Sequence, residues 1–254
     1  MKRTAIVLIS AMLLAGSVEA ASCSSTGGKF NGWKKEFAAE AKANGIKAKG
    51  LAALASSSYS SGTIKADRNQ KSFKLSLEQF MAKRGAAAII SRGKKLKAAN
   101  AALFDKLEKK YGVPPGPLIA IWGMETGFGA VTGNQPTISA VATLAYDCRR
   151  SDYFTEHLHA ALKLVDRGVL SSGTRGAMHG EVGQTQFLPK NILIYGTGGD
   201  LNNKANALAS TANFLSGVGW KKGGPYSAGQ FASWNAATVY QKALAIMATK
   251  IDAK

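Results

Sequence analysis

The chain of 254 residues carries 33 lysines and arginines against 15 aspartates and glutamates, a net charge of +18. Such a basic excess indicates a polyanionic partner (nucleic acid, an anionic membrane face or an anionic cell-wall polymer) or a solvated basic surface that aids solubility. Beyond the N-terminal segment, no stretch reaches the roughly 18–20 apolar residues of a membrane-spanning helix, which excludes a transmembrane span there.

Residues 1–20 have the pattern of a secretory signal peptide. Lys2 and Arg3 are basic, residues 5–15 form a short apolar run, and residues 18–20 (Val-Glu-Ala) occupy the usual cleavage positions. The apolar run is too short to span a membrane, and the alternative is a frayed N-terminal helix. We therefore expect an exported, periplasmic protein that is soluble after cleavage, and export argues against nucleic acid as its partner.

The remaining chain, residues 21–254, can bury a full core as one domain, or as one domain with a lobe. Its hydrophobic pattern is mostly helical, with apolar residues at helical spacing and only weak strand signals. Gly112 ends one helix and Pro114-Pro115 open the next. The pattern predicts a mostly α fold with little β, in which any sheet is a short hairpin. The predicted helices are 33–43, 47–55, 77–90, 94–111, the apolar helix that starts at Pro114-Pro115, 136–146, 151–167, 203–215 and 238–251, with loops at 57–62 and 168–183.

The two cysteines, Cys23 and Cys148, predict one disulfide in an oxidising compartment, although two free thiols are the alternative. The bond would close a long loop, worth about 4–5 kcal/mol on the chain-entropy model. Ser22 stands where a lipoprotein anchor needs Gly or Ala, so we do not expect Cys23 to be lipidated.

Glu125 lies in Ile-Trp-Gly-Met-Glu-Thr-Gly-Phe-Gly, residues 121–129, at the end of a strongly apolar helix. Burial raises the pKa of a carboxyl group, and a raised pKa makes it a proton donor near neutral pH. The alternative is a structural glutamate paired with an arginine.

Three further segments carry candidate binding residues. Gln184 and Gln186, in the glycine-containing segment 180–189, offer amides suited to sugar hydroxyl and acetamido groups, or form an ordinary polar loop before a helix. The adjacent pair Arg149 and Arg150 can grip a carboxylate or pair with internal acids. The aromatic side chains near the C-terminus can stack on sugar rings or belong to the core; this last segment contains Trp234, Asn235 and Tyr240.

These segments together resemble the lytic murein transglycosylases of B type, from about Ile64 to the C-terminus, whereas residues 21–63 match poorly. The motifs that carry the resemblance are Tyr-Gly-Val-Pro-Pro (111–115), the Glu125 motif, Ala-Thr-Leu-Ala-Tyr-Asp (142–147) with the two arginines, Gly-Gln-Thr-Gln-Phe-Leu-Pro (183–189) and Ala-Leu-Ala-Ser-Thr-Ala-Asn-Phe-Leu (207–215).

The resemblance implies a lysozyme-like helical catalytic domain with an additional N-terminal helical lobe. We expect a basic helical part over about 29–92 and a catalytic body over about 93–254. The basic excess is concentrated in residues 29–110, which hold 19 basic and 6 acidic side chains. Glu125 takes the family's catalytic position, and Gln186 takes that of a glutamine that holds the glycan. The other groove positions are matched by, or lie beside, Arg149, Arg150, Trp234, Asn235 and Tyr240.

Two segments depart from the family's pattern. Gly180-Glu181-Val182 replaces the usual Gly-Ala-Met, which places an acid one loop away from Glu125. Some relatives bind calcium through an acidic loop, but residues 195–203 here contain only Asp200, too few carboxylates for such a site. We expect no metal and no cofactor.

Most glycosidases use two carboxylates, but no second acid is placed by a motif here, since Asp147 and Glu181 are unassigned. A single acid suits a transglycosylase. The resemblance implies that Glu125 protonates the leaving oxygen and then removes the proton of the C6 hydroxyl, so that a 1,6-anhydromuramic end forms, whereas the residues alone indicate only the acid/base role. We expect a monomer that acts on peptidoglycan strands and not on nucleic acid. The alternatives are a hydrolytic muramidase, a non-catalytic murein-binding envelope protein and a basic nucleic-acid binder.

Overall fold

A computed structural model describes residues 21–69, 71–221 and 225–253, so the predicted signal peptide lies outside the described residues. The described chain forms twelve α-helices, three 3-10 helices (η) and one two-stranded antiparallel sheet, which confirms the prediction of a mostly α fold with little β. None of these helices is both long enough and apolar enough to cross a bilayer.

The elements follow one another along the chain as η1 (Gly27–Lys29), α1 (Phe30–Ala43), α2 (Ala48–Ser56), α3 (Ser61–Arg68), η2 (Lys71–Lys74), α4 (Leu77–Lys83), α5 (Ala86–Ala99), α6 (Ala101–Tyr111), α7 (Pro115–Thr126), β1 (Gln135–Pro136), α8 (Thr137–Tyr146), α9 (Ser151–Asp166), β2 (Arg175–Gly176), α10 (Pro189–Tyr195), α11 (Lys204–Gly217), η3 (Ala228–Phe231) and α12 (Thr238–Asp252).

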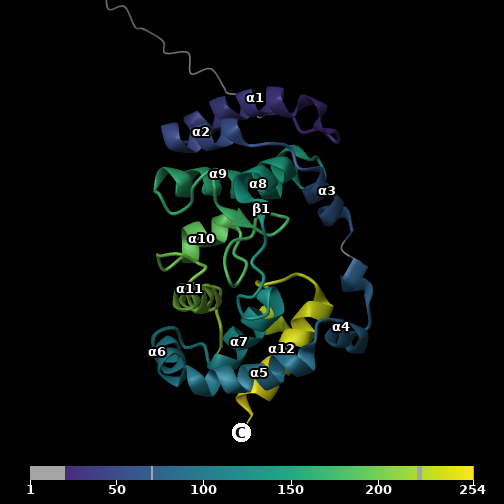
Figure 1. Cartoon of the computed structure of the whole chain (residues 1–254), viewed down its shortest axis with the longest axis vertical. Coiled ribbons are helices and arrows are strands. Elements are labelled where there is room, and N and C mark those ends of the chain that lie inside the picture. The colour runs from purple at the N-terminus through teal and green to yellow at the C-terminus, as the bar shows by residue number, and fades with distance from the viewer. Residues whose placement is uncertain (1–20, 70, 222–224, 254) are drawn as a thin grey trace, which may run out of the picture.

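The molecule is elongated, and its helices form layers along the long axis (Figure 1). Helices α1 and α2 cover α8 and α9 at one end, while α5 and α12 pack on α7 at the other, with α4 against α5 and α12. Between the two ends lie α10, α11 and the small sheet, whose strands pair Gln135 with Gly176. The strands come from distant segments, so the sheet is not the hairpin that the sequence allowed.

The basic N-terminal part expected over about 29–92 is divided between the two ends. Helices α1 and α2 pack on α8 and α9, whereas α4 and α5 pack on α12, and α5 also on α7. The reason is that the apolar faces have different partners: Trp33 of α1 stacks near Tyr146 of α8, and Gly93 of α5 lies against Ile119 and Ile251. The boundary expected near residue 92 falls inside α5.

Two predicted helices are each broken by one turn. The segment 77–90 is interrupted at Gly85, which has a left-handed φ of 66° that glycine adopts without strain. The segment 94–111 is interrupted at Asn100, whose side-chain amide donates to the Leu96 carbonyl while its own carbonyl accepts from Phe104. Helix α3 lies partly in the segment expected to be a loop, because Ser60 caps it by accepting from the Thr63 backbone N–H.

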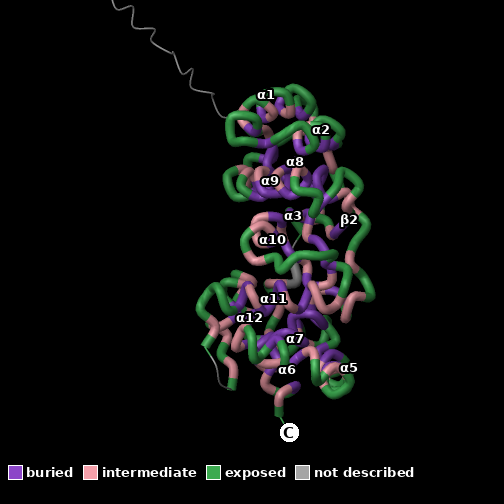
Figure 2. Tube along the Cα trace, turned by 90° about the vertical axis from the view of Figure 1, so that its left-hand side faces the viewer, coloured by how far each residue is buried: buried purple, intermediate pink, exposed green. Residues whose placement is uncertain are grey.

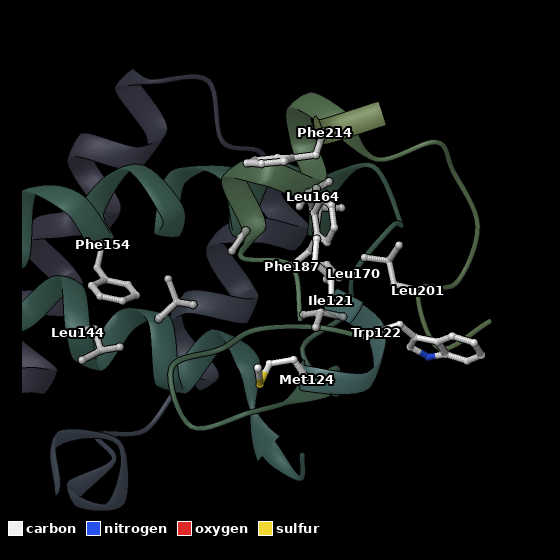
Figure 3. Close-up of a cluster of buried hydrophobic side chains, with 14 of the residues drawn as sticks. Ile121, Trp122, Met124, Leu144, Phe154, Leu164, Leu170, Phe187, Leu201 and Phe214 are labelled. Atoms are coloured by element: carbon white, nitrogen blue, oxygen red, sulfur yellow. The ribbon is translucent and has the colours of Figure 1, made fainter. Parts of the chain in front are cut away.

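The core runs along the molecule between the outer helix faces (Figure 2). Helices α7 and α8 are buried nearly all round. For α7, the apolar composition of the helix predicts this burial. Side chains from distant segments meet there, including Ile121 of α7, Phe187 of the loop before α10 and Phe214 of α11 (Figure 3). Glu125 is therefore carried on a helix that packing holds from several sides.

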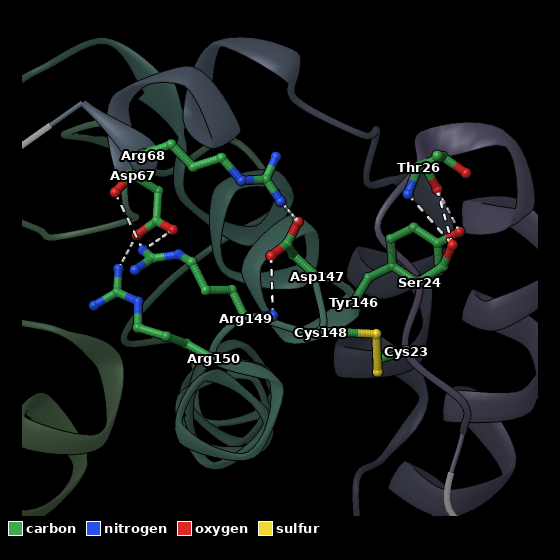
Figure 4. A network of polar contacts seen from close by, with 10 residues as sticks. All are labelled: Cys23, Ser24, Thr26, Asp67, Arg68, Tyr146, Asp147, Cys148, Arg149 and Arg150. Carbon is green, nitrogen blue, oxygen red and sulfur yellow. Dashed lines mark hydrogen bonds and ion pairs between the residues drawn. A yellow bond between two sulfur atoms is a disulfide. The ribbon is translucent and has the colours of Figure 1, made fainter.

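The N-terminal tail is tied to the end of α8. Cys23 and Cys148 form a disulfide across 125 residues of chain, with Cα atoms 5.0 Å apart. Beside it, the Ser24 backbone N–H donates to the Tyr146 carbonyl, and the Tyr146 hydroxyl donates to the Thr26 carbonyl (Figure 4). The pairing that the two cysteines predict is thus present.

Replacing Cys23 and Cys148 together by alanine is expected to lower the free energy of unfolding by about 4 kcal/mol, because the bond closes a long loop in the unfolded chain. Guanidinium unfolding followed by tryptophan fluorescence measures this, with reduced wild-type protein as the control. Identical unfolding midpoints for the oxidised, reduced and substituted proteins would contradict it.

Candidate active site

A cavity of about 830 Å³ opens between the two ends of the molecule. Its wall combines the end of α7, the loop before α10, the segment before α12 and the starts or ends of α4 and α9. The lining residues that carry polar or aromatic groups are Phe73, Arg84, Glu125, Arg150, Tyr153, His179, Glu181, Gln186, Phe187, Asn191, Ser233, Trp234, Asn235 and Tyr240.

Glu125 lies in this cavity and is held by two neutral donors. The Tyr240 hydroxyl donates to its carboxyl oxygen Oε1 at 2.6 Å, and Trp234 Nε1 donates to the same atom at 3.0 Å. Burial raises the pKa of Glu125 from 4.5 to about 7, although these two hydrogen bonds act in the opposite direction. The carboxyl group is therefore largely protonated at slightly acidic pH and lies where a ligand can reach it.

The chain turns sharply after Glu125. Gly127 ends α7 with φ 58°, and Phe128 and Gly129 follow with φ 67° and 81°. A side chain at Gly129 would meet the Gln184 side chain at 2.5 Å, so only glycine fits this close approach. The turn brings Phe128 back against Trp122 at 5.2 Å between ring centres. The glycines of the motif are thus needed to fold the chain back onto α7.

Gln184 holds α7 and the loop before α10 together. Its Oε1 accepts from Trp122 Nε1 at 2.8 Å, and its Nε2 donates to the Asn202 carbonyl. Its backbone carbonyl accepts from the Thr126 hydroxyl at 2.6 Å. Gln184 does not line the cavity, so the structure gives it an internal partner for each amide atom and not the groove position expected.

Gln186 lines the same cavity as Glu125. It has a left-handed φ of 56°, which is unusual for a residue with a side chain. Its Nε2 donates to the carbonyls of Thr132 and Gly183, at 3.2 and 2.9 Å. The bonds of the described residues thus engage the amide nitrogen and leave the oxygen for a ligand.

The three predicted residues near the C-terminus all line the cavity. Trp234 and Tyr240 bind Glu125, and Trp234 also packs edge-on against Phe187 at 5.5 Å. Asn235 accepts from the Ala237 backbone N–H at 2.9 Å, which shapes the turn before α12. Trp234 and Tyr240 thus bind Glu125 directly, whereas Asn235 stabilises the turn beside them.

The two adjacent arginines bind an internal acid. Asp67 of α3 is 2% exposed, and both Arg149 and Arg150 donate to its carboxylate, while Arg68 pairs with buried Asp147 at 2.6 Å (Figure 4). Of the two, only Arg150 lines the cavity. The two arginines therefore pair with an internal acid, which was the alternative to binding the carboxylate of a ligand. This contact fixes α3 to the start of α9.

Several cavity residues carry no sequence signal. Phe73 and Arg84 come from η2 and the end of α4, outside every motif, and Tyr153 and Asn191 reach the cavity through packing of α9 and α10. No local pattern predicts them, because the cavity forms only when segments that are far apart in the sequence pack together. Glu181 stands out in the sequence only as a departure from a family pattern.

A family model described as "Transglycosylase SLT domain" matches residues 29–232. The chain belongs to this family. Together with the relatives below, this match confirms the resemblance to B-type lytic murein transglycosylases, and it begins well before the start expected near Ile64.

Among characterised relatives, the membrane-bound lytic murein transglycosylase B of Escherichia coli (strain K12) is 33% identical over 121 residues. The matched segment is 44% of this chain and 34% of that protein. The chain thus spans about a third of this relative.

Solved structures have the same fold. SltB3 from Pseudomonas aeruginosa, in complex with NAG-anhNAM-pentapeptide, is 32% identical with a TM-score of 0.71, over 79% of this chain and 56% of SltB3. The E. coli lytic transglycosylase Slt35, in complex with bulgecin A, has a TM-score of 0.75 at 17% identity, over 93% of this chain and 97% of Slt35. The mostly helical, lysozyme-like class is therefore shown.

Slt35 has also been crystallised with calcium. In this chain, residues 195–203 stand where the sequence resemblance places the acidic calcium loop of some relatives. Asp200 Oδ1 accepts from the backbone and side chain of Asn202, at 2.8 and 3.1 Å. Within the described ranges, no three His, Cys, Asp or Glu side chains cluster as metal ligands would. A loop with one engaged carboxylate does not fit a calcium site.

The different placement of the two glutamines predicts different effects. Gln184→Ala is expected to lower the free energy of unfolding by about 1–3 kcal/mol, because Trp122 Nε1 loses a part-buried acceptor. Gln186→Ala, the matched variant two residues away, is expected to lower it less. Urea unfolding curves compare them, and a larger loss for Gln186→Ala would show that the assignment is reversed.

The raised pKa of Glu125 predicts a pH-dependent effect on stability. The folded state disfavours the carboxylate, so stability is lost as the pH rises from 4.5 to about 7, by up to about 3 kcal/mol. Glu125→Gln keeps an acceptor for Tyr240 and Trp234 and is expected to be more stable than wild type above pH 7, but not below pH 4.5. Thermal unfolding at pH 4 and 8 measures this, with Glu125→Ala as a control that loses the acceptor at both. An advantage of Glu125→Gln that is independent of pH would argue against it.

Proposed function

We propose that this protein is a lytic transglycosylase that cleaves the β-1,4 bond between N-acetylmuramic acid and N-acetylglucosamine in peptidoglycan and leaves a 1,6-anhydromuramic end. The observation that carries the proposal is a cavity that contains the Glu125 carboxyl group, whose pKa burial raises to about 7 and which two neutral donors hold. Family membership supports the substrate class, and the complex of SltB3 with an anhydro-muropeptide supports the product class.

In the first step Glu125 acts as a general acid. Its proton passes to the glycosidic oxygen, the bond between that oxygen and C1 of the muramic acid breaks, and positive charge develops on the sugar ring. A pKa of about 7 suits this step, because the group is protonated near neutral pH yet gives up its proton readily.

In the second step the same residue acts as a base. The Glu125 carboxylate, still bound by Tyr240 and Trp234, removes the proton of the C6 hydroxyl as that oxygen bonds to C1. The ring closes, and Glu125 is protonated again for the next cycle. The two donors suit both steps, because a hydrogen bond to a carboxyl oxygen steadies the charged form without trapping it as an ion pair.

The groove supplies orientation. The free amide oxygen of Gln186 can accept from an acetamido N–H, and the part-exposed Arg150, already bound to Asp67, adds positive charge for the carboxylates of the substrate. The exposed Tyr153 ring, 50% accessible, offers a face for a sugar. We further propose that the protein acts after export, which the predicted signal peptide and the disulfide support.

Glu125→Gln is expected to reduce cleavage of purified peptidoglycan at least 100-fold, because the proton donor is lost while both hydrogen bonds to the side chain can remain. For wild type, kcat/KM is expected to be level below pH 7 and to fall about tenfold per pH unit above it. Turbidity of peptidoglycan suspensions measures both, and an active Glu125→Gln protein would remove the assignment.

The products decide between the proposed reaction and hydrolysis. An anhydro end is one water lighter than a reducing end, so mass spectrometry of the released fragments separates the two. Reducing ends alone would establish a muramidase, and binding to peptidoglycan without release would establish a non-catalytic wall protein.

A further inference from the structure

We propose that Glu181 is a second carboxylate of the active site, held in a fixed orientation by His179, whose negative charge acts on Glu125 and faces the charge that develops on the bound sugar. The effect of Glu181 on the sugar rests on the proposed function. Its effect on Glu125 does not, because it concerns only how two side chains of this chain interact. It assigns a role to the residue that replaces alanine in the Gly-Ala-Met pattern.

The geometry places both acids in one cavity. Glu125 enters it from the end of α7 and Glu181 from the loop between β2 and α10, and both line its wall. The Glu181 side chain is 23% exposed, and His179 holds both carboxylate oxygens. The His179 backbone N–H donates to Oε2 at 3.0 Å, and its ring Nδ1 lies 3.2 Å from Oε1. The carboxylate is thus fixed in orientation by one neighbouring residue.

The surrounding charges leave Glu181 ionised. Behind His179, its other ring nitrogen lies 3.7 Å from Asp67, whose charge is balanced by Arg149 and Arg150. Burial acts to raise the pKa of Glu181, but the hydrogen bonds and charge of His179 and the backbone N–H groups lower it below its ordinary value. Among the groups on the packed elements that act on the acid are Arg150 and Tyr153 of the α9 start.

Glu125 experiences the opposite balance. Burial raises its pKa first, Tyr240 and Trp234 lower it, the negative charge of Glu181 raises it, and Arg84 lowers it. The pKa values of the two carboxyl groups in this cavity are thus shifted in opposite directions, so that Glu125 favours the acid form and Glu181 the carboxylate. Such a separation is how enzymes assign acid and base roles to chemically identical groups.

The same arrangement bears on the reaction. A fixed negative charge in a partly enclosed cavity stabilises positive charge that develops on the sugar ring, and it does so without reorganising when the bond breaks. Glu181 needs no covalent step for this role and gives up no proton. It therefore acts as a positioning and electrostatic residue, while Glu125 alone moves the proton.

The test compares Glu181→Gln, Glu181→Asp and Glu181→Ala with wild type, and Glu156→Gln serves as a control on the exposed face of α9. In Glu181→Gln and Glu181→Ala, the fall of kcat/KM at high pH is expected to begin about 0.5–1 pH unit lower, because the neighbouring negative charge is gone. The rate at pH 6 is expected to fall about tenfold. Glu181→Asp and Glu156→Gln are expected to keep the wild-type profile.

A second measurement is independent of activity. Carbon NMR of the side-chain carboxyl of Glu125, assigned with Glu125→Gln, gives its titration midpoint directly in wild type and in Glu181→Gln. A lower midpoint in the variant supports the proposal even if the products prove to be hydrolytic, in which case only the proposed function fails. Equal midpoints, or pH profiles that superimpose, overturn the role of Glu181, and loss of activity without any shift shows that the residue is merely structural.

Discussion

The site depends on one constraint: a carboxyl group must sit among apolar side chains without an ion-pair partner. Glu125 meets it because α7 is apolar on every side and is buried, while only the end of the helix reaches the cavity. Its two donors, Trp234 and Tyr240, lie more than 100 residues further along the chain. The raised pKa of Glu125 is consequently a property of the folded protein, since neither the burial nor the hydrogen bonds exist in the unfolded chain.

The architecture serves this constraint by building the cavity from two ends that are fastened together. Helices α7, α4 and α12 bring Glu125, Arg84 and Tyr240, whereas α9 and the loop before α10 bring Arg150 and Glu181. The fastening is polar and partly buried: Asp67 takes both arginines, and Gln184 joins the loop to α7. Removing one partner from such a cluster leaves the other polar groups without hydrogen bonds in a low-dielectric setting, which lowers stability. These residues therefore have a structural role in addition to any role in binding.

The sequence predicts those features that local chemistry determines. An acid in an apolar helix predicts Glu125, and most helices follow from apolar spacing. The misplaced details were decided by single residues or by distant contacts. Gln184 and Gln186 look equivalent in the sequence, but Gln184 bonds to Trp122, whereas Gln186, with its left-handed backbone, lines the cavity. Arg149 and Arg150 are likewise adjacent, and their shared partner, Asp67, belongs to a helix that the sequence pattern had not shown.

The division of the N-terminal segment also changes how the basic charge is understood. The excess over residues 29–110 is not one patch, because α1 and α2 expose lysines such as Lys35 and Lys42 at one end, and α5 and α6 expose Lys95 and Lys109 at the other. The cavity itself is lined by charges of both signs, Arg84 and Arg150 as well as Glu181. On the proposed function, a polymer with carboxylates along its length meets positive charge over both ends of the molecule, which suits the binding of an anionic chain. The cation-like sugar that forms at the cleavage point then faces the Glu181 carboxylate within this mixed lining, which suits the breaking of one bond of that chain.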